Sequence, residues 1–482
     1  MERIGKSGGG LCLAGAGFLW GWSFLFFFSS QAASSISLSF LTNDVLYLGS
    51  TLVAALLAVK VFWNEYDVRQ LRTVGNAAFA LMLAGSVLLA ISMVARDSGF
   101  YAMAGKIVAG PGQGLSWIAW TTVLSRFDIE CAERSFLQWI PILVGVVLAS
   151  TLGNWVSVFP PQLFNSVLMV LLPVASWVFF CRALSLSSEP KRKDASVAAA
   201  EGKGDDVKSI VWLFANLSFA LAVIMVVWAA FLFQHQVSVE QVKVVFSLGA
   251  FVALPIVWFA LRVTRRLAPS SLYRWAVPIM AFAVVLDFIA PAAYVWCTCL
   301  CLSVVSVGFE GMYHLVFIYV SKRFSQRAML AASLGVVATT LGGMIGSTVW
   351  AACFSHASSA DAGKILLVAL FVLVLCWSCA PRFGGVLGLN GGGVEGEASS
   401  QNSPPVEKKC ELAANAYGLT PREREVLFLL AQGRSRAFIR EALFISKGTV
   451  DTHVHHIYSK MGIGSKDELV KMVLDGEDII AS

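Results

Sequence analysis

Residues 419–433, with the sequence LTPREREVLFLLAQG, predict the first helix of a small polar domain near the end of the chain. Thr420 precedes Pro421 and is followed three residues later by Glu423, which is the pattern of a capping box with proline at the first helical position. Gly433 lies where a helix stop is expected. One face of this helix is apolar through Val426, Leu427, Leu429 and Leu430.

Three further start signals follow the first helix. Ser435 is placed to cap a short helix through Leu443, and Ser446 to cap a third helix that reaches about Met461. The Gly462-Ile463-Gly464 segment breaks that helix, and Ser465 with Glu468 forms a second capping-box pattern that opens a fourth helix to about Asp475. Two helices joined by a short turn, the second one polar on one side, indicate a helix-turn-helix.

At these residues the sequence resembles the LuxR-type DNA-binding domain of bacterial regulators. The resemblance covers about 56 residues and rests on the framework positions Leu419–Leu427, Ala431-Gln432-Gly433, Ile445-Ser446, Thr449-Val450, His453, Ile457, Lys460-Met461-Gly462 and Ser465. It implies that the third helix enters the major groove of double-stranded DNA, which displays a distinct donor and acceptor pattern for each base pair.

The resemblance also implies roles for individual residues. The base-facing positions fall on Asp451, Thr452 and His455, and Asp451 departs from the basic residue common there. An aspartate cannot hold guanine O6 and N7, but it can accept a hydrogen bond from cytosine N4. Phosphate contacts are expected at Lys447, Thr449 and Lys460.

The charge of this region is modest, because residues 419–474 hold nine Lys and Arg against six Asp and Glu. We therefore expect two copies to bind DNA together. The resemblance implies a homodimer formed through the fourth helix, with Leu469, Val470 and Val473 as the pairing residues, while the alternative is that these side chains are core. Arg434, Arg436 and Arg440 either add nonspecific attraction or form a solvated face.

Upstream of this domain, residues 381–418 change in composition to Gly, Ser and Pro. Such a segment cannot bury a core and predicts a flexible linker. The helix-turn-helix domain is expected to occupy residues 419–482.

Residues 1–380 are strongly apolar. The 482-residue chain is 57% hydrophobic and only 14% charged, with a mean hydropathy of +0.72, which excludes a single large soluble enzyme, a disordered chain and a coiled coil. Its formal charge of +6 is too small to choose between lipid and nucleic acid. Twelve apolar blocks are each long enough for a membrane-spanning helix: 11–30, 45–63, 74–95, 101–124, 137–157, 162–183, 210–233, 244–263, 273–290, 295–320, 328–353 and 364–380.

The placement of Lys and Arg predicts the orientation of these spans. Alternate connecting segments hold 17 and 3 basic residues, which assigns the first set to the cytoplasm of a bacterial cell with the protein in its inner membrane. Both chain ends then lie inside. Small residues at 29–35 also fit a signal-peptidase site, but the apolar run before them is long for a signal peptide, and we favour a retained helix.

A long internal loop, 184–209, divides the spans into two halves of six, residues 1–183 and 210–380. This all-α layout resembles the major facilitator superfamily, whose halves surround a site near the membrane midplane. The resemblance rests on span count and symmetry, since the short basic motif of that family is only faintly echoed by Asp67, Arg69 and Arg72.

Ionisable residues at membrane depth are costly and mark candidate sites. Glu310 and His314 lie four residues apart on one helix face and are a candidate ligand or proton site, the alternative being a structural pair. Asp287 and Lys106 are further candidates near the outer surface. Trp117 and Trp120 follow a Pro- and Gly-containing stretch, and either line a cavity or pack in the core. The cysteines of the apolar blocks are expected to pack as reduced thiols.

The sequence therefore predicts a membrane-anchored one-component transcription regulator, in which a twelve-span bundle senses an unknown small molecule or a membrane signal and a cytoplasmic tail binds promoter DNA. No catalytic constellation, metal site or cofactor motif is apparent, so we expect no enzyme activity. One alternative is a secondary transporter with a regulatory DNA-binding tail. Another is a scaffold without transport activity whose tail binds protein.

Overall fold

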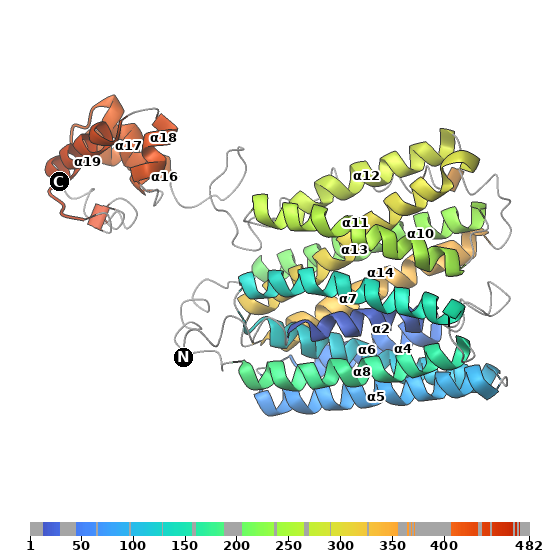
Figure 1. Cartoon of the computed structure of the whole chain (residues 1–482). Coiled ribbons are helices and arrows are strands. Elements are labelled where there is room, and N and C mark those ends of the chain that lie inside the picture. The colour runs from blue at the N-terminus through green and yellow to red at the C-terminus, as the bar shows by residue number, and fades with distance from the viewer. Residues whose placement is uncertain are drawn as a thin grey trace. The chain divides into compact units, whose positions relative to one another are not determined.

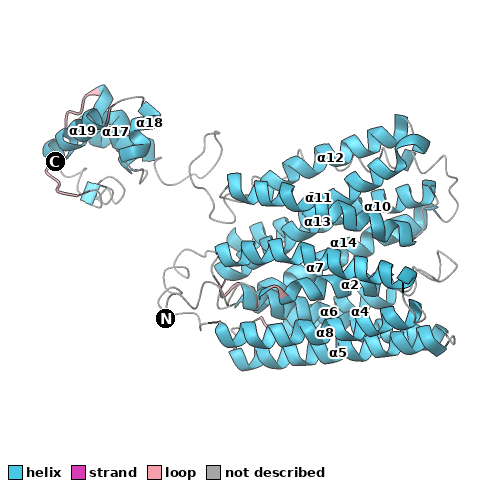
Figure 2. Cartoon of the chain, in the orientation of Figure 1, coloured by secondary structure: helices cyan, strands magenta, loops and turns pink. Residues whose placement is uncertain are grey.

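In the computed structural model the described residues form helices joined by short turns and loops, and the chain divides into two units, residues 1–391 and 392–482 (Figures 1 and 2). The described residues are 13–28, 45–63, 66–95, 98–127, 129–156, 161–187, 205–235, 239–264, 269–289, 291–324, 327–354, 364–365, 368, 371, 406–431, 436–443, 446–465, 468–469 and 472. The expectations for the linker residues 381–405, for the helix stop at Gly433 and for the cap at Ser435 lie outside the described residues.

Eleven helices of the first unit coincide with the first eleven predicted apolar blocks. They are α2 (Gly15–Phe28), α4 (Gly49–Val61), α5 (Val68–Ala95), α6 (Ser98–Leu124), α7 (Ile129–Val156), α8 (Pro161–Leu186), α10 (Asp205–His235), α11 (Val239–Thr264), α12 (Pro269–Ile289), α13 (Pro291–Arg323) and α14 (Ala328–Phe354). Six stretches among the described residues are long and apolar enough to cross a membrane, by length and composition: Val68–Val94, Cys131–Gly153, Leu163–Leu186, Leu213–His235, Val295–Arg323 and Ala328–Ala352. The twelfth predicted block, 364–380, lies mostly outside the described residues.

The eleven helices pack as two halves that meet along their length (Figure 1). In the first half, α5 packs against α6 and α8, and α2 packs against α7 and α8. In the second half, α10 packs against α14, and α13 packs against α11 and α12. The halves are joined by contacts of α7 with α11, of α4 and α6 with α14, and of α13 with α6 and α7.

Tryptophan side chains hold the first half together through their indole N–H groups. Trp22 donates to the hydroxyl of Ser86 at 2.9 Å, and Trp139 donates to the carbonyl of Leu13 at 3.0 Å. Both rings are fully buried. The first bond ties α2 to α5, and the second ties Leu13, just before α2, to α7. The block for which signal-peptide cleavage was an alternative therefore forms part of the core.

The second unit has its own core, built from four described helices: α16 (Val406–Ala416), α17 (Pro421–Ala431), α18 (Arg436–Leu443) and α19 (Lys447–Met461). Helix α16 lies inside the segment predicted as linker, and its Cys410, Ala413 and Ala414 are buried in this core. The composition of 381–418 concealed it because the Gly, Ser and Pro residues end at Pro405, and the next residues form a short amphipathic helix.

Candidate DNA-binding interface and membrane-embedded polar cluster

Local capping contacts set the ends of the helices in the second unit. The backbone N–H of Thr420 donates to the Glu423 carboxylate at 2.8 Å, and the N–H of Glu423 donates to the Thr420 hydroxyl at 3.4 Å. The capping box predicted at the start of α17 is therefore confirmed. Ser465 accepts from the N–H of Glu468 at 3.2 Å, while the Glu468 carboxylate accepts from the N–H of Gly464.

Helix α19 is delimited at both ends as the sequence predicts. The Ser446 hydroxyl accepts from the N–H of Thr449 at 3.1 Å, and Gly462 ends the helix in the left-handed region at φ +69°. This backbone conformation carries a steric cost for residues with a Cβ, which is why glycine is favoured there.

Burial divides α19 into a core face and an outer face. Val450, Val454, Ile457 and Met461 are buried against the other helices of the unit. Thr449, Thr452 and His455 are exposed and follow one another at helical spacing on the other side. A polar face of this kind, on a helix held at both ends, is suited to entering a DNA major groove.

Asp451, the third residue predicted to face the bases, has a partner inside the domain. Its carboxylate lies 2.9 Å from the guanidinium of Arg436, on the preceding helix α18, and both side chains are largely exposed. An exposed ion pair of this kind contributes little to stability. The ion pair places the Arg436 side chain beside Asp451, next to the outer face of α19. Nothing in the sequence indicates this pairing.

Lys460, predicted to bind a phosphate, contacts Glu423 of α17 within the domain. Its ammonium donates to the Glu423 carboxylate at 2.6 Å and to the carbonyl of Gly418 at 3.4 Å. His456 Nδ1 lies 3.6 Å from the other carboxylate oxygen of Glu423. Burial alone would raise the pKa of Glu423, but the hydrogen bonds from Lys460 and Thr420 and the charge of Lys460 lower it to about 2.

The remaining residues predicted for the tail are placed only in part. Thr449 is exposed, and its hydroxyl lies 2.8 Å from that of Ser446. The side chains of Lys447, Val470 and Val473 lie outside the described residues. Leu469, predicted for dimerisation with packing in the core as the alternative, is fully buried in the core of its own domain.

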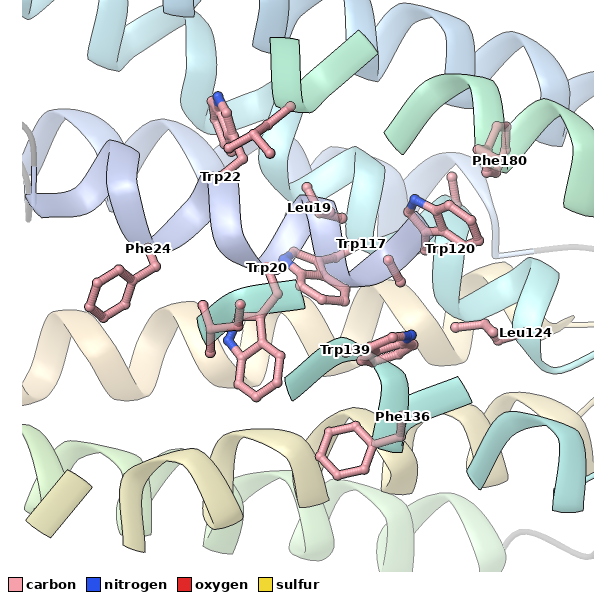
Figure 3. Packing of buried hydrophobic residues seen from close by; sticks show 14 of the residues in the cluster. Leu19, Trp20, Trp22, Phe24, Trp117, Trp120, Leu124, Phe136, Trp139 and Phe180 are labelled. Atoms are coloured by element: carbon pink, nitrogen blue, oxygen red, sulfur yellow. The ribbon is translucent and has the colours of Figure 1, made fainter. Parts of the chain in front are cut away.

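In the first unit, aromatic rings surround His314 of α13. Its imidazole stacks on Trp117 of α6, with ring centroids 3.8 Å apart, and lies edge-on to Trp20 of α2 and Trp139 of α7 at 6.5 and 6.3 Å. His314 is buried, and neither ring nitrogen has a hydrogen-bond partner among the described residues. Figure 3 shows the tryptophans and Phe136 gathered from α2, α6 and α7.

Glu310 lies one turn before His314, but the two side chains do not pair. The Glu310 carboxylate accepts from the hydroxyl of Tyr313 at 3.4 Å and is also in hydrogen-bonding contact with Trp20. It is partly exposed although the rings beside it are buried. The sequence places Glu310 and His314 on one helix, but nothing in it indicates that the rings of Trp20, Trp117 and Trp139, all more than 170 residues away, lie beside them.

The two other ionisable candidates of the membrane unit have structural partners. Asp287 of α12 lies 2.7 Å from His235 Nε2 at the end of α10. Lys106 of α6 is fully buried and donates to the carbonyl of Phe26, in the last turn of α2. A cation near the C-terminal end of a helix complements the helix dipole.

Of the two tryptophans predicted either to line a cavity or to pack, Trp120 packs. Its indole N–H donates to the hydroxyl of Ser176 at 3.0 Å, which ties α6 to α8. Trp117 also packs, and its ring stacks on the imidazole of His314.

The two units resemble two different groups of known proteins. Residues 418–473 match the sequence model of the family described as bacterial regulatory proteins, luxR family. Over 58 residues the chain is 46% identical to the HTH-type transcriptional regulator Mb0914c of Mycobacterium bovis, and over 56 residues it is 46% identical to the oxygen regulatory protein NreC of Staphylococcus aureus. Each match covers 12% of this chain, but only 7% of the mycobacterial protein and 26% of NreC.

The first unit is similar in fold to solved transporters. A bacterial homologue of the iron transporter ferroportin, in the outward-facing state with soaked iron, aligns with a TM-score of 0.54 and 18% identity over 78% of this chain and 97% of that one. The major facilitator superfamily proton:xylose symporter XylE, bound to 6-bromo-6-deoxy-D-glucose, aligns with a TM-score of 0.55 and 12% identity over 78% and 95% of the two chains.

Residues 418–473 are thus a LuxR-type helix-turn-helix domain, and the helices before them have the fold of the major facilitator superfamily. Both resemblances predicted from the sequence, and the all-α fold class, are confirmed. At 12–18% identity the membrane unit shares a fold with these transporters, and its own activity is a separate question.

Proposed function

We propose that the protein is a membrane-anchored one-component transcription regulator, in which the first unit senses a signal and the second binds promoter DNA. The observation that supports this most directly is the presence, in one chain, of a major facilitator fold and a LuxR-type domain with an exposed polar face on α19. The proposal assigns no chemical step to the protein.

The arrangement in the cell follows from charge. One set of alternate connecting segments holds 17 Lys and Arg, and the other set holds 3. Because the basic set is expected on the cytoplasmic side, we propose that the protein lies in the inner membrane with the second unit in the cytoplasm, where it can reach the chromosome. The linker is proposed to be about residues 381–405, which shortens the segment expected from composition, because α16 belongs to the DNA-binding unit.

DNA contact is proposed to use Thr452, His455 and the Arg436–Asp451 pair for base readout, with Thr449 and Lys447 on phosphates. The net charge of the domain is small, so we propose that two copies bind adjacent half-sites. Leu469 is buried, which leaves Val470 and Val473 of the predicted pairing residues for a homodimer contact.

Glu310 and His314 are proposed as the sensory site. Both lie where α13 meets α6 and α7 of the other half, so a molecule bound there contacts both halves at once. A ligand that binds one arrangement of the halves more tightly than another shifts the population between them.

The test is selection of genomic DNA fragments by the full-length protein in lipid nanodiscs, together with a reporter fused after Ser482. We expect a defined set of sequences to be enriched and the reporter to be active on the cytoplasmic side. Failure to enrich any sequence at low salt, or an external reporter, contradicts the proposal.

A second candidate function is transport with a tail that regulates expression of the transporter. It is favoured by the fold shared with a symporter and by a carboxylate inside the bundle at Glu310. Accumulation of a substrate in vesicles, lost in Glu310→Gln, would support transport. Unchanged DNA selection by the same variant would separate the two activities.

A further inference from the structure

Three exposed arginines lie at one end of the helix pair α5 and α8, on the outside of the membrane unit. We propose that Arg69, Arg72 and Arg182, with the neighbouring side chains of Asn76 and Trp177, bind the headgroup of an anionic phospholipid. Neither the sensing nor the DNA binding proposed above gives these residues a role, so the inference goes beyond the proposed function. It is carried by the register of the two helices, by the charge at their ends and by a polar pair on the same surface.

The register of the two helices brings the arginines to the same end. Helices α5 and α8 lie side by side at the edge of the first unit (Figure 1), and contacts at both ends of the pair show that they are antiparallel. The indole N–H of Trp177 donates to Asn76 Oδ1 at 2.9 Å. One turn toward the end of the pair, Arg72 lies close enough to Cys181 for its charge to act on the thiol. Arg182 follows Cys181 and therefore lies at the same end as Arg72.

The charge at this end is positive, and neither helix supplies a counter-ion. Helices α5 and α8 contain no Asp or Glu at any position. No described residue accepts a hydrogen bond from the guanidinium groups of Arg69, Arg72 and Arg182. Asp67, just before α5, is exposed and forms no ion pair with a described residue. Because a guanidinium group keeps its charge in proteins, the cluster attracts an anion from the surroundings.

Other cations of the basic connecting segments have partners inside the protein. Lys322 donates to the carbonyl of Phe127 at 2.5 Å, which links α13 to the end of α6. The guanidinium of Arg126 lies over the ring of Tyr66, with its carbon 5.6 Å from the ring centroid. The arginines of α5 and α8 differ from these cations because their charges stay on the outer surface.

The position of the arginines along the two spans favours a lipid headgroup over a soluble anion. Arg72 lies four residues after the start of the apolar stretch Val68–Val94, and Arg182 lies four residues before the end of Leu163–Leu186. At 1.5 Å per residue each lies about 6 Å inside its span, from where a long side chain reaches the phosphates of a bilayer. The surface beside them is apolar, since Val178 is 52% exposed. Guanidinium groups bind phosphate through paired hydrogen bonds, and basic surfaces between spans bind anionic headgroups.

The pair of Asn76 and Trp177 supplies a second contact, one turn deeper than Arg72. Both side chains are exposed, although they lie within the apolar stretches of their helices. Asn76 accepts through Oδ1, and no described residue accepts a hydrogen bond from its amide N–H groups. These groups are suited to the ester oxygens of a phospholipid, which lie just below its phosphate. Tryptophan is itself enriched at the depth of the headgroups.

The experiment is a lipid titration of the full-length protein in detergent, followed by native mass spectrometry. The probes are dioleoylphosphatidylglycerol, which is anionic, and dioleoylphosphatidylcholine, which has the same acyl chains and no net charge. We expect the first phosphatidylglycerol to bind at least about fivefold more tightly than phosphatidylcholine. Millimolar inorganic phosphate should not displace it, because the acyl chains contribute to binding.

Variants make the test specific. Arg72→Gln and Arg182→Gln should each weaken phosphatidylglycerol binding by about fivefold, the effect of one basic residue near an anionic lipid surface. The double variant should bind the two lipids alike. Arg327→Gln, which removes an exposed arginine between α13 and α14, should bind like the parent. Asp67→Asn, which removes the nearby negative charge, should bind phosphatidylglycerol more tightly than the parent.

Three results would overturn the inference. The parent could bind both lipids equally, inorganic phosphate could displace phosphatidylglycerol, or the double variant, shown by size exclusion to be folded, could keep the preference of the parent. The measurement involves neither DNA nor a signal, so failure of the proposed regulator and failure of the lipid site are separate outcomes.

Discussion

The ammonium of Lys460 lies 2.6 Å from the carboxylate of Glu423 and joins the last turn of α19 to the first turn of α17. Glu423 is 3% exposed, and the same carboxylate closes the capping box with Thr420. One acidic residue therefore both caps the start of α17 and holds the far end of α19. The orientation of α19 depends on this contact as well as on apolar packing.

Replacing Lys460 with methionine should destabilise the second unit. The buried carboxylate would lose its cationic partner, which we expect to lower the free energy of unfolding by about 1–3 kcal/mol. Urea unfolding of residues 392–482 measures this, with Ser459→Ala, an exposed neighbour, as the control. An unchanged midpoint combined with weaker DNA binding would instead assign Lys460 to a phosphate contact, as the sequence alone suggested.

The free energy of unfolding of the second unit should fall as the pH is lowered below about 4.5. The pKa of Glu423 is lowered from 4.5 to about 2 on folding, so its contribution is fully present above pH 4.5 and is lost as the pH falls toward 2. The shift corresponds to about 3 kcal/mol. In Glu423→Gln this part of the pH dependence should be missing. Glu425→Gln, which alters an exposed carboxylate two residues away, should retain it; equal curves for the two variants would contradict the assignment.

The ion pair between Arg436 and Asp451 predicts a shared effect on sequence preference. If Arg436 positions Asp451 for the bases, Arg436→Ala and Asp451→Ala should change the selected base at the same position. Because the pair is exposed, stability should change by only about 0.5 kcal/mol. Selection from a random DNA pool tests this. A change with Asp451→Ala alone would show that Asp451 acts without Arg436.

His455→Ala should relax specificity at one base position, at a cost of about 1–3 kcal/mol for the preferred base. Lys447→Ala is the comparison, since loss of a phosphate contact weakens all sequences about equally. Titration of the preferred site and of single-base variants distinguishes the two patterns. If His455→Ala binds every sequence like the parent, the outer face of α19 is not the reading face.

Gly311 allows the two halves of the membrane unit to approach. A Cβ built at this position lies 1.8 Å from Cζ of Phe136, on α7 of the other half, so Gly311→Ala should overpack the contact by about 1–3 kcal/mol and lower the thermal unfolding temperature of the purified protein. Gly308→Ala is the matched control, because a Cβ there meets nothing within 4 Å. Phe136→Leu in the Gly311→Ala background should recover part of the loss, and no recovery would argue against this contact as the cause.

The features that were predictable from the sequence are those with local causes. Thr420 and Glu423 cap α17, Ser446 caps α19 and Gly462 ends it, and each acts on backbone atoms within a few residues. The apolar blocks of the membrane unit were likewise recognisable because the requirement of the bilayer acts on every span separately.

The features that were missed depend on residues far apart or on weak local signals. The partner of Lys460 lies 37 residues away and that of Glu310, Trp20, lies nearly 300 away, so no spacing rule reveals them. Leu469 has the same sequence signature whether it pairs two domains or fills one core. Helix α16 follows a Pro- and Gly-rich stretch, and composition averaged over that stretch hides it.

Helix α16 has a practical consequence for any isolated DNA-binding fragment. The luxR match begins at residue 418, twelve residues after α16 starts, and a fragment trimmed to that match would lose Cys410, Ala413 and Ala414 from the core. The apolar side of α17 against which α16 packs would then be exposed to solvent, and such a fragment would tend to aggregate. A fragment that begins before Val406 keeps the apolar contact between α16 and α17.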